Sequence, residues 1–220
     1  MTPPNSTLST LRIEPFTMGP FATNCFVVWV EDETECWIID ASFEPQPIID
    51  AVRSKNLEPS RILLTHAHAD HIAGLEQVKA AFPNARVAIH PDEASWLTDP
   101  VANLSASQGW SLTPGPPDEA INHDERLTLA GHNFRVIHVP GHSPGSCCFY
   151  SESDGVAISG DALFAGSIGR TDFPTANHDL LIRSIKERLY TLPDDTIVLP
   201  GHGPDTTIGR ERTTNPFVRG

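Results

Sequence analysis

The chain has 220 residues, of which 39% are hydrophobic and 20% charged, a composition that suits one globular domain with a substantial core. The excess of 28 acidic over 15 basic side chains gives a formal net charge of −13, which argues against a general nucleic-acid or anionic-membrane surface. No stretch is apolar for long enough to span a bilayer, and residues 1–16 lack the pattern of a secretory signal. We therefore expect a cytoplasmic protein with a single domain over residues 1–220.

The four cysteines are Cys25, Cys36, Cys147 and Cys148, and they form no CxxC pair. Disulfide-stapled scaffolds are usually shorter and denser in cysteine. We expect four reduced and mostly buried thiols. Cys147 and Cys148 are adjacent on a predicted strand, so their side chains should point to opposite faces.

The first half of the chain alternates apolar strands with amphipathic helices. The pattern predicts a hairpin from residues 24–30 and 36–40. It then predicts a helix over 47–56, a strand over 61–66, a helix over 71–83 and a strand over 86–91. Residues 98–125 are rich in Pro, Gly, Ser and Asp, and most of this segment is expected to be an irregular loop.

The second half repeats the order of strands followed by a helix. Paired strands are predicted over residues 126–142, a hairpin over 146–152 and 155–161, and a last strand over 196–202. Leu181, Ile185 and Leu189 recur at intervals of four within a predicted helix over 178–192. Two such halves favour an α/β fold, a four-layer αββα sandwich in which two mixed sheets pack face to face with helices outside.

Three histidines and an aspartate lie within the six positions from His66 to His71. His66 and His68 are two residues apart at the end of a predicted strand, so their imidazoles share one face. Asp70 and His71 follow where the next helix is expected to begin. One short segment can thus direct two imidazoles at one point and a carboxylate with an imidazole at a neighbouring point.

Three later segments repeat one arrangement, in which an apolar strand ends in a glycine that precedes a metal-ligand residue. Glycine permits a sharp turn and a close approach of the backbone to a site. Strand ends on one side of a sheet are also rigid supports for a shared centre. These pairs are Gly141–His142, Gly160–Asp161 and Gly201–His202.

The segments THAHADH, GH, GD and GH, in this order, resemble the ligand set of metallo-β-lactamase-fold hydrolases, and the resemblance covers nearly the whole chain. It implies a first ion bound by His66, His68 and His142. It implies a second ion bound by Asp70, His71 and His202, with Asp161 bridging the two.

Two cations held about 3.5–4 Å apart can share a bridging water and convert it into a hydroxide nucleophile near neutral pH. Asp70 is expected to orient that nucleophile, and Asp161 to hold the pair of ions together. A structural zinc site would instead be closed by four protein ligands, usually including cysteine, and none of the four cysteines is a candidate ligand here. Two divalent ions are expected, zinc foremost, although iron and manganese suit the same ligands.

Asp161 stands where true β-lactamases of this fold commonly place a cysteine, and in this it resembles glyoxalase II and related thioesterases. Arg170 matches a basic residue that contacts the carboxylate of glutathione in glyoxalase II, although a structural salt bridge is an equal alternative. Asp172 stands near the position of a glutathione-contacting tyrosine of those enzymes, and we expect no counterpart of their C-terminal helical portion. The resemblance implies hydrolysis of a small thioester, foremost S-(2-hydroxyacyl)glutathione.

Other functions are compatible with the same residues. The segment GRTDF is also characteristic of persulfide dioxygenases of the same fold, which would use one iron on His66, His142 and Asp161. A lactone or another ester is an alternative hydrolase substrate, and a non-enzymatic metal-binding or redox-partner module is a third possibility. Ordinary structural roles are expected for the remaining histidines, although His138 could orient a ligand: His90, His123, His132, His138 and His178. Trp96 and Trp110 are expected to cover the edge of the core, although they could instead line the substrate mouth.

Overall fold

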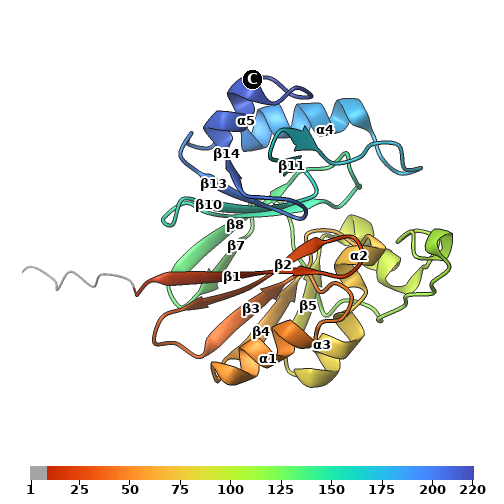
Figure 1. Ribbon diagram of the computed structural model, residues 1–220, viewed down its shortest axis with the longest axis vertical. Helices are drawn as coiled ribbons and strands as arrows, with labels where there is room; N and C mark the ends of the chain where they lie inside the picture. Colours follow the sequence, from red (N-terminus) through yellow and green to blue (C-terminus); the bar gives the residue numbers. More distant parts are fainter. Residues whose placement is uncertain (1–8) are drawn as a thin grey trace, which may run out of the picture.

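The computed structural model describes residues 9–220, and two six-stranded sheets packed face to face form its centre (Figure 1). Residues 1–8, part of the stretch in which no secretory signal is expected, lie outside the described residues. The first sheet contains, in spatial order, β1 (Leu11–Met18), β2 (Thr23–Val30), β3 (Glu35–Ile39), β4 (Glu58–Leu63), β5 (Arg86–Ile89) and β6 (Glu119–Ala120).

The second sheet comes from the other half of the chain. Its spatial order is β14 (Thr206–Thr207), β13 (Ile197–Pro200), β10 (Val156–Gly160), β9 (Cys147–Ser151), β8 (His132–His138) and β7 (Arg126–Leu129). Both sheets are mixed, because β3 to β6 pair in parallel in the first and β10 pairs in parallel with β13 in the second. A separate two-stranded sheet joins β11 (Leu163–Phe164) to β12 (Ser167–Ile168).

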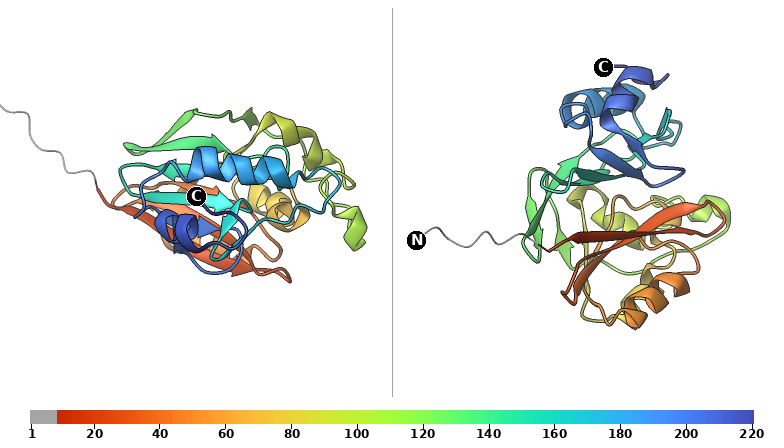
Figure 2. Two further views of the ribbon diagram at one scale, coloured as in Figure 1. Left: turned by 90° about the horizontal axis from the view of Figure 1, so that it is seen from above. Right: turned by 60° about the vertical axis from the view of Figure 1, so that its left-hand side comes forward.

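Helices cover the outer faces of both sheets (Figures 1 and 2). The first sheet carries α1 (Gln46–Ser54) and α3 (Leu75–Ala81), while α4 (His178–Ser184), continued by the π-helix η3 (Ile185–Leu189), and α5 (Ile208–Thr214) lie on the second. The predicted four-layer αββα sandwich is therefore confirmed. Within residues 9–220, no helix combines the length and the apolar character needed to cross a membrane.

Strand β2 shows how alternation builds the three apolar layers of the sandwich. Cys25 and Val27 belong to the cluster between the first sheet and its helices, whereas Phe26 and Val28 belong to the cluster between the sheets. A third cluster lies beneath α4 and α5. Side chains of period two thus serve both faces of a sheet that is covered on both sides.

The cysteines follow the prediction. All four are free and buried. The adjacent residues Cys147 and Cys148 fall in different clusters, Cys147 between the sheets and Cys148 beneath the helices of the second sheet.

Several elements differ from the sequence-based expectation. The helix predicted over 71–83 is two helices, α2 (Ala69–Ile72) and α3, separated at Gly74. A Cβ atom on Gly74 would lie 2.2 Å from the carbonyl oxygen of Ser42, so the chain turns where the backbone packs closely against another segment.

Strand β1 was not predicted, although its sequence LRIEPFTM alternates apolar and other residues. Pro15 obscures that pattern, and its missing N–H is tolerated because β1 is an edge strand. The predicted loop over 98–125 contains the short 3₁₀ helix η2 (Ala106–Gln108) and β6, and it follows a further 3₁₀ helix, η1 (Pro91–Thr98).

Candidate metal centre

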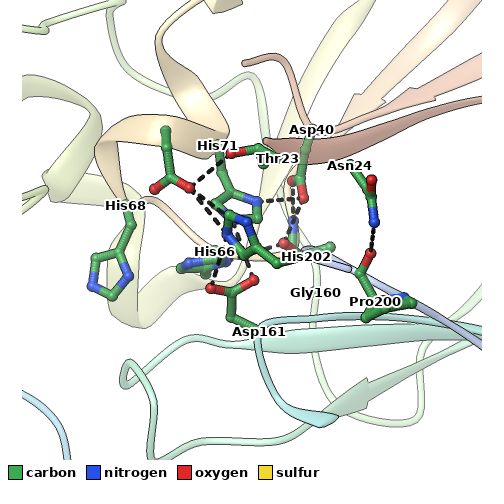
Figure 3. Close-up of polar contacts among 12 residues, drawn as sticks. Thr23, Asn24, Asp40, His66, His68, His71, Gly160, Asp161, Pro200 and His202 are labelled. Atoms are coloured by element: carbon green, nitrogen blue, oxygen red, sulfur yellow. Dashed lines mark hydrogen bonds and ion pairs between the residues drawn. The ribbon is translucent and has the colours of Figure 1, made fainter. Parts of the chain in front are cut away.

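Strand ends from both sheets meet at one edge of the sandwich and bring together all seven side chains that the sequence singled out as ligands. Figure 3 labels His66, His68, His71, Asp161 and His202 among them. His66 and His68 follow β4, His142 follows β8, Asp161 follows β10 and His202 follows β13. Asp70 and His71 lie in α2. Within each of three groups, one ligand atom per residue lies within 4.8 Å of the others: His66, His68 and His142; His66, His71 and Asp161; Asp70, His71 and His202.

The first half-site, defined as His66, His68 and His142, consists only of imidazoles. All three side chains are buried. Nδ1 of His68 lies 2.9 Å from Nε2 of His142, and the His66 ring lies edge-on to both neighbouring rings. Neutral ring nitrogens that face one another at this spacing are suited to a shared cation.

The second half-site, defined as Asp70, His71 and His202, contains a carboxylate. Oδ2 of Asp70 lies 3.5 Å from Nε2 of His71 and 3.2 Å from Nε2 of His202. The hydroxyl of Thr23, at the start of β2, donates to the same oxygen at 2.9 Å. This bond orients the Asp70 carboxylate from outside the half-site.

Asp161 contacts both half-sites, and its carboxylate points toward His71 and His202 in Figure 3. Its Oδ1 is 3.3 Å from Nε2 of His71. Its Oδ2 is 3.6 Å from Nε2 of His142 and 3.5 Å from Nε2 of His202. One carboxylate therefore reaches imidazoles of both half-sites, which is the arrangement needed for a bridging ligand.

Unpaired buried atoms test whether these residues fit a pair of divalent ions. Among the described residues, Nε2 of His66 and Nε2 of His68 are buried without a hydrogen-bond partner, and Nε2 of His71 and Oδ1 of Asp161 face each other at 3.3 Å without a well-formed hydrogen bond. Such atoms are costly in a folded protein, and most are satisfied by a partner or an ion. Histidine nitrogens and carboxylate oxygens are also ordinary ligands of zinc, iron and manganese. The donor set therefore fits divalent metal.

Burial sets the protonation of the first half-site. It lowers the pKa of His66 and His142 and lowers that of His68 to about 3, with further lowering by neighbouring histidines. Neutral imidazoles carry a free lone pair at neutral pH. The first half-site is therefore electrically neutral, and its imidazoles can donate lone pairs to a cation.

Carboxylates dominate the second half-site. Burial would lower the pKa of His71 and His202, but Asp70 and Asp161 outweigh it, raising that of His71 well above its ordinary value and that of His202 to about 9. Burial would likewise raise the pKa of both carboxyls, yet the histidines lower that of Asp70 to about 2 and that of Asp161 well below its ordinary value. The carboxylates and imidazoles of the second half-site thus pair with one another, and an ion bound there would replace the imidazole protons.

Asp40 supports the second half-site from behind and was not identified from the sequence. It is buried at the end of β3, where it accepts hydrogen bonds from the backbone N–H of Thr65 at 2.8 Å and from the Thr65 hydroxyl at 2.7 Å. It also accepts one from Nδ1 of His71 at 2.8 Å. A signal was present, since Asp40 ends the apolar run CWIID just as Asp161 follows GVAISG. A carboxylate behind a ligand histidine fixes its tautomer and orientation.

Glu93 connects the two loops that carry the first half-site, and no sequence signal marks it. Its carboxylate is fully buried in η1, and no Lys, Arg or His among residues 9–220 forms an ion pair with it. It accepts hydrogen bonds from the backbone N–H of Ala67 at 2.6 Å, from the Ser143 hydroxyl and from the backbone N–H of Gly145 at 2.7 Å. Ala67 lies between His66 and His68, so one side chain sets the spacing of all three ligands.

Two of the glycines act as the sequence predicted. A Cβ atom on Gly201 would lie 2.2 Å from Oδ1 of Asp161, so the backbone there passes directly beside the centre. Gly160 has a φ of +51°, and a Cβ atom on it would lie 2.6 Å from Cβ of Thr65. A larger residue at position 201 would displace the Asp161 carboxylate, and one at position 160 would collide with Thr65.

Aromatic side chains flank the centre on the Arg170 side. The Phe173 ring lies 5.1 Å from that of His68 and 5.9 Å from that of His142. Arg170 stacks on Phe173 at 4.6 Å and forms two bonds, of 2.9 and 2.8 Å, with the carboxylate of Asp172. The carbonyl of Arg170 accepts a bond from Nδ1 of His142 at 2.8 Å, so the backbone of Arg170 orients a candidate ligand.

The two tryptophans have different environments. Trp96 is buried and packs near His68 with ring centroids 5.8 Å apart, at the edge of the core. Trp110 packs against Phe43 at 4.7 Å and against the half-exposed Phe21 at 6.1 Å. The carbonyl of Phe21 in turn accepts a bond from Nδ1 of His202 at 3.1 Å. A second aromatic group therefore lies beside the second half-site.

Comparison with known proteins places this architecture. Residues 18–202 match the model of the metallo-beta-lactamase superfamily. The chain belongs to this superfamily. Among curated relatives, the probable metallo-hydrolase YqgX of Bacillus subtilis is 40% identical over 92% of this chain and 95% of its own length. The hydroxyacylglutathione hydrolase GloC of Haemophilus influenzae is 36% identical over 94% of this chain and 98% of its own length.

Solved structures of the superfamily agree closely with the fold. The BLEG-1 B3 metallo-beta-lactamase superposes with a TM-score of 0.90 at 40% identity, covering 95% of this chain and all of the other. TTHA1623 in a di-iron-bound form gives 0.82 at 37% identity, covering 93% and 100%. ETHE1 from Myxococcus xanthus gives 0.77 at 25% identity, covering 93% and 83%.

Proposed function

We propose that this protein is a binuclear metal-dependent hydrolase that cleaves a small thioester, foremost S-(2-hydroxyacyl)glutathione. The observation that carries the binuclear part is the position of Asp161, whose two oxygens lie 3.3–3.6 Å from imidazoles of both half-sites. The relative named as a hydroxyacylglutathione hydrolase, matched over nearly its whole length, supports the choice of substrate.

The first half-site would hold one ion and the second half-site the other, with Asp161 between them. Two divalent ions in such a centre supply Lewis acidity, which lowers the pKa of water and polarises an acyl carbonyl. Asp70 is placed to accept a hydrogen bond from the attacking water, because Thr23 and His202 already orient one of its oxygens. Asp40 and Glu93 would keep the imidazoles in place through the reaction.

Arg170 is the proposed contact for a substrate carboxylate. Its side chain is 69% exposed beside the centre, but its guanidinium is already engaged by Asp172. A substrate carboxylate must therefore displace or share that partner. Bidentate guanidinium–carboxylate pairing suits either partner equally well.

The Arg170 proposal is tested by two variants. Arg170→Ala should raise KM for S-lactoylglutathione with kcat little changed, lowering kcat/KM about tenfold or more. Asp172→Asn should lower KM for the same substrate, because it frees the guanidinium. Neither variant should affect a thioester without a carboxylate. Equal losses on charged and neutral thioesters would show that Arg170 is structural.

Steady-state assays test the reaction class. S-lactoylglutathione should be hydrolysed faster than simple acyl thioesters, a lactone, a phosphodiester or a cephalosporin. The cephalosporin belongs in the panel because a similar solved structure is named a B3 metallo-beta-lactamase. Turnover confined to a non-thioester would overturn the thioesterase proposal and leave the metal centre as proposed.

Elemental analysis of protein purified without added metal tests the cofactor. We expect two ions per chain, zinc foremost, and the relative solved in a di-iron form makes iron the principal alternative. One iron per chain, together with oxygen consumption on glutathione persulfide, would instead support a mononuclear dioxygenase using His66, His142 and Asp161. The segment GRTDF, at residues 169–173, gives that alternative its place in the test.

A further inference from the structure

A second group of metal-ligand side chains lies outside the metal centre, at the ends of β5 and β8. His90 follows β5, Asp92 lies in the first turn of η1, and His138 ends β8. One ligand atom from each of these three residues lies within 4.8 Å of the others. His123 adjoins the group, since its Nδ1 accepts a hydrogen bond from the backbone N–H of His138 at 3.2 Å.

The hydrogen bonds of the two rings leave the lone pair of His138 free and that of His90 in one long hydrogen bond, which an ion would replace. Nε2 of His138 lies 2.7 Å from the carbonyl oxygen of Pro144, which can only accept, so Nε2 carries the proton and Nδ1 carries the lone pair. Ligand histidines usually donate their other N–H to a carbonyl in this way. Nδ1 of His90 accepts from the backbone N–H of Asp92 at 3.3 Å and lies 3.6 Å from Oδ2 of Asp92.

The environment keeps both rings neutral and within reach of solvent. The rings stack with centroids 3.9 Å apart and planes inclined by 13°. Burial lowers the pKa of His90 and of His138, and the charge of Arg188 lowers that of His138 further. His90 is buried, His138 is half-buried, and Asp92 and His123 are exposed, so the group opens toward solvent.

We propose that His90, Asp92 and His138 form a peripheral site for a transition-metal dication such as Zn²⁺. Two imidazoles and a carboxylate match the ligand types of zinc, and water would complete the coordination. The stacked rings must turn so that their lone pairs converge on the ion. Arg188, which donates to the carbonyl of His138, places a positive charge nearby, and the carboxylate of Asp92 offsets it. The proposed site is independent of the proposed function.

Zinc counting on the holoenzyme tests the site. The metal centre is first saturated with zinc, so that exchange of ions there does not change the number of zinc ions bound per chain. The parent protein should then bind one more equivalent of Zn²⁺ per chain in equilibrium dialysis than the double variant His90→Asn/His138→Gln. Asparagine keeps an acceptor at the start of η1, and glutamine keeps a side-chain donor for the Pro144 carbonyl.

The control is His178→Gln, which removes one exposed histidine elsewhere and should retain the additional equivalent. Equal zinc counts in the parent and the double variant would overturn the proposal. If the double variant fails to fold, ¹⁵N imidazole resonances of the parent decide. Those of His90 and His138 should shift on adding the last equivalent, and unchanged resonances would overturn the proposal.

Discussion

The two half-sites lie side by side at one edge of the sandwich, yet they are held in place by different physics. The first is three neutral imidazoles whose loops are connected by hydrogen bonds to one buried carboxylate, Glu93. The second is a set of carboxylates and imidazoles that contact one another directly, supported by Asp40. The geometry of candidate ligands can therefore be imposed through the backbone or through contacts among the side chains themselves, and this centre combines both.

Removing the residue that the two half-sites share should have the largest effect. Asp161→Ala is expected to lower kcat by more than about 100-fold, above the usual loss from removing an outer partner of a metal ligand. Metal content should fall in both half-sites. Metal per chain and kcat are the measurements, with Asp50→Ala, an exposed carboxylate on α1, as the control. Full metal content in Asp161→Ala would contradict the bridging role.

Glu93→Gln should weaken the first half-site selectively. The amide nitrogen cannot accept a hydrogen bond, so the N–H of Ala67 or of Gly145 loses its partner. We expect metal affinity of the first half-site to fall about 10–100-fold. The free energy of unfolding should fall by about 1–3 kcal/mol. Metal titration and chemical denaturation measure the two effects. Equal weakening of metal binding in both half-sites would show that Glu93 does not support the first half-site selectively.

Asp40→Asn is the matched change in the second half-site. Its amide group cannot accept at both of the positions that now receive bonds from Thr65 and His71. The affinity of the second half-site should fall within the same range of about 10–100-fold, toward its lower end because Asp70 and Asp161 still orient His71. Loss of the first ion instead of the second would contradict this assignment.

The smallest expected effect concerns an imidazole–carboxylate pair far from the centre. Burial would lower the pKa of His132, but hydrogen bonds to Asp154 and to the carbonyl of Ser9 outweigh it and raise that pKa. A raised folded-state pKa gives stabilisation that is complete below the unfolded value of about 6.5 and is lost as pH rises through the folded value.

His132→Gln should therefore lower the melting temperature by a few °C at acidic pH, and the difference from the parent should narrow as pH rises. Thermal denaturation of both proteins across this range is the measurement. A difference that stays constant with pH would show that His132 contributes packing and not charge.

Much of the fold and the complete candidate ligand set could be predicted from the sequence. Candidate ligands that follow apolar strands, as His66 and Asp161 do, can be recognised because the strand pattern and the ligand chemistry occur in one short segment. The order of the layers could be predicted because strands and helices alternate along the chain. Strand β1 was missed because Pro15 interrupts an otherwise regular alternation.

Only the tertiary structure decided which side chains support the candidate ligands and which carboxylate pairs with Arg170. Glu93 lies 26 positions from Ala67 and 52 from Gly145, and Asp40 lies 31 from His71. No local pattern encodes contacts at such separations, because they arise when the loops of different strands meet. The same holds for the group of His90, Asp92 and His138, whose members each look ordinary in sequence. Local periodicity determined the elements and the ligands, whereas packing of the two sheets determined how each ligand is oriented and charged.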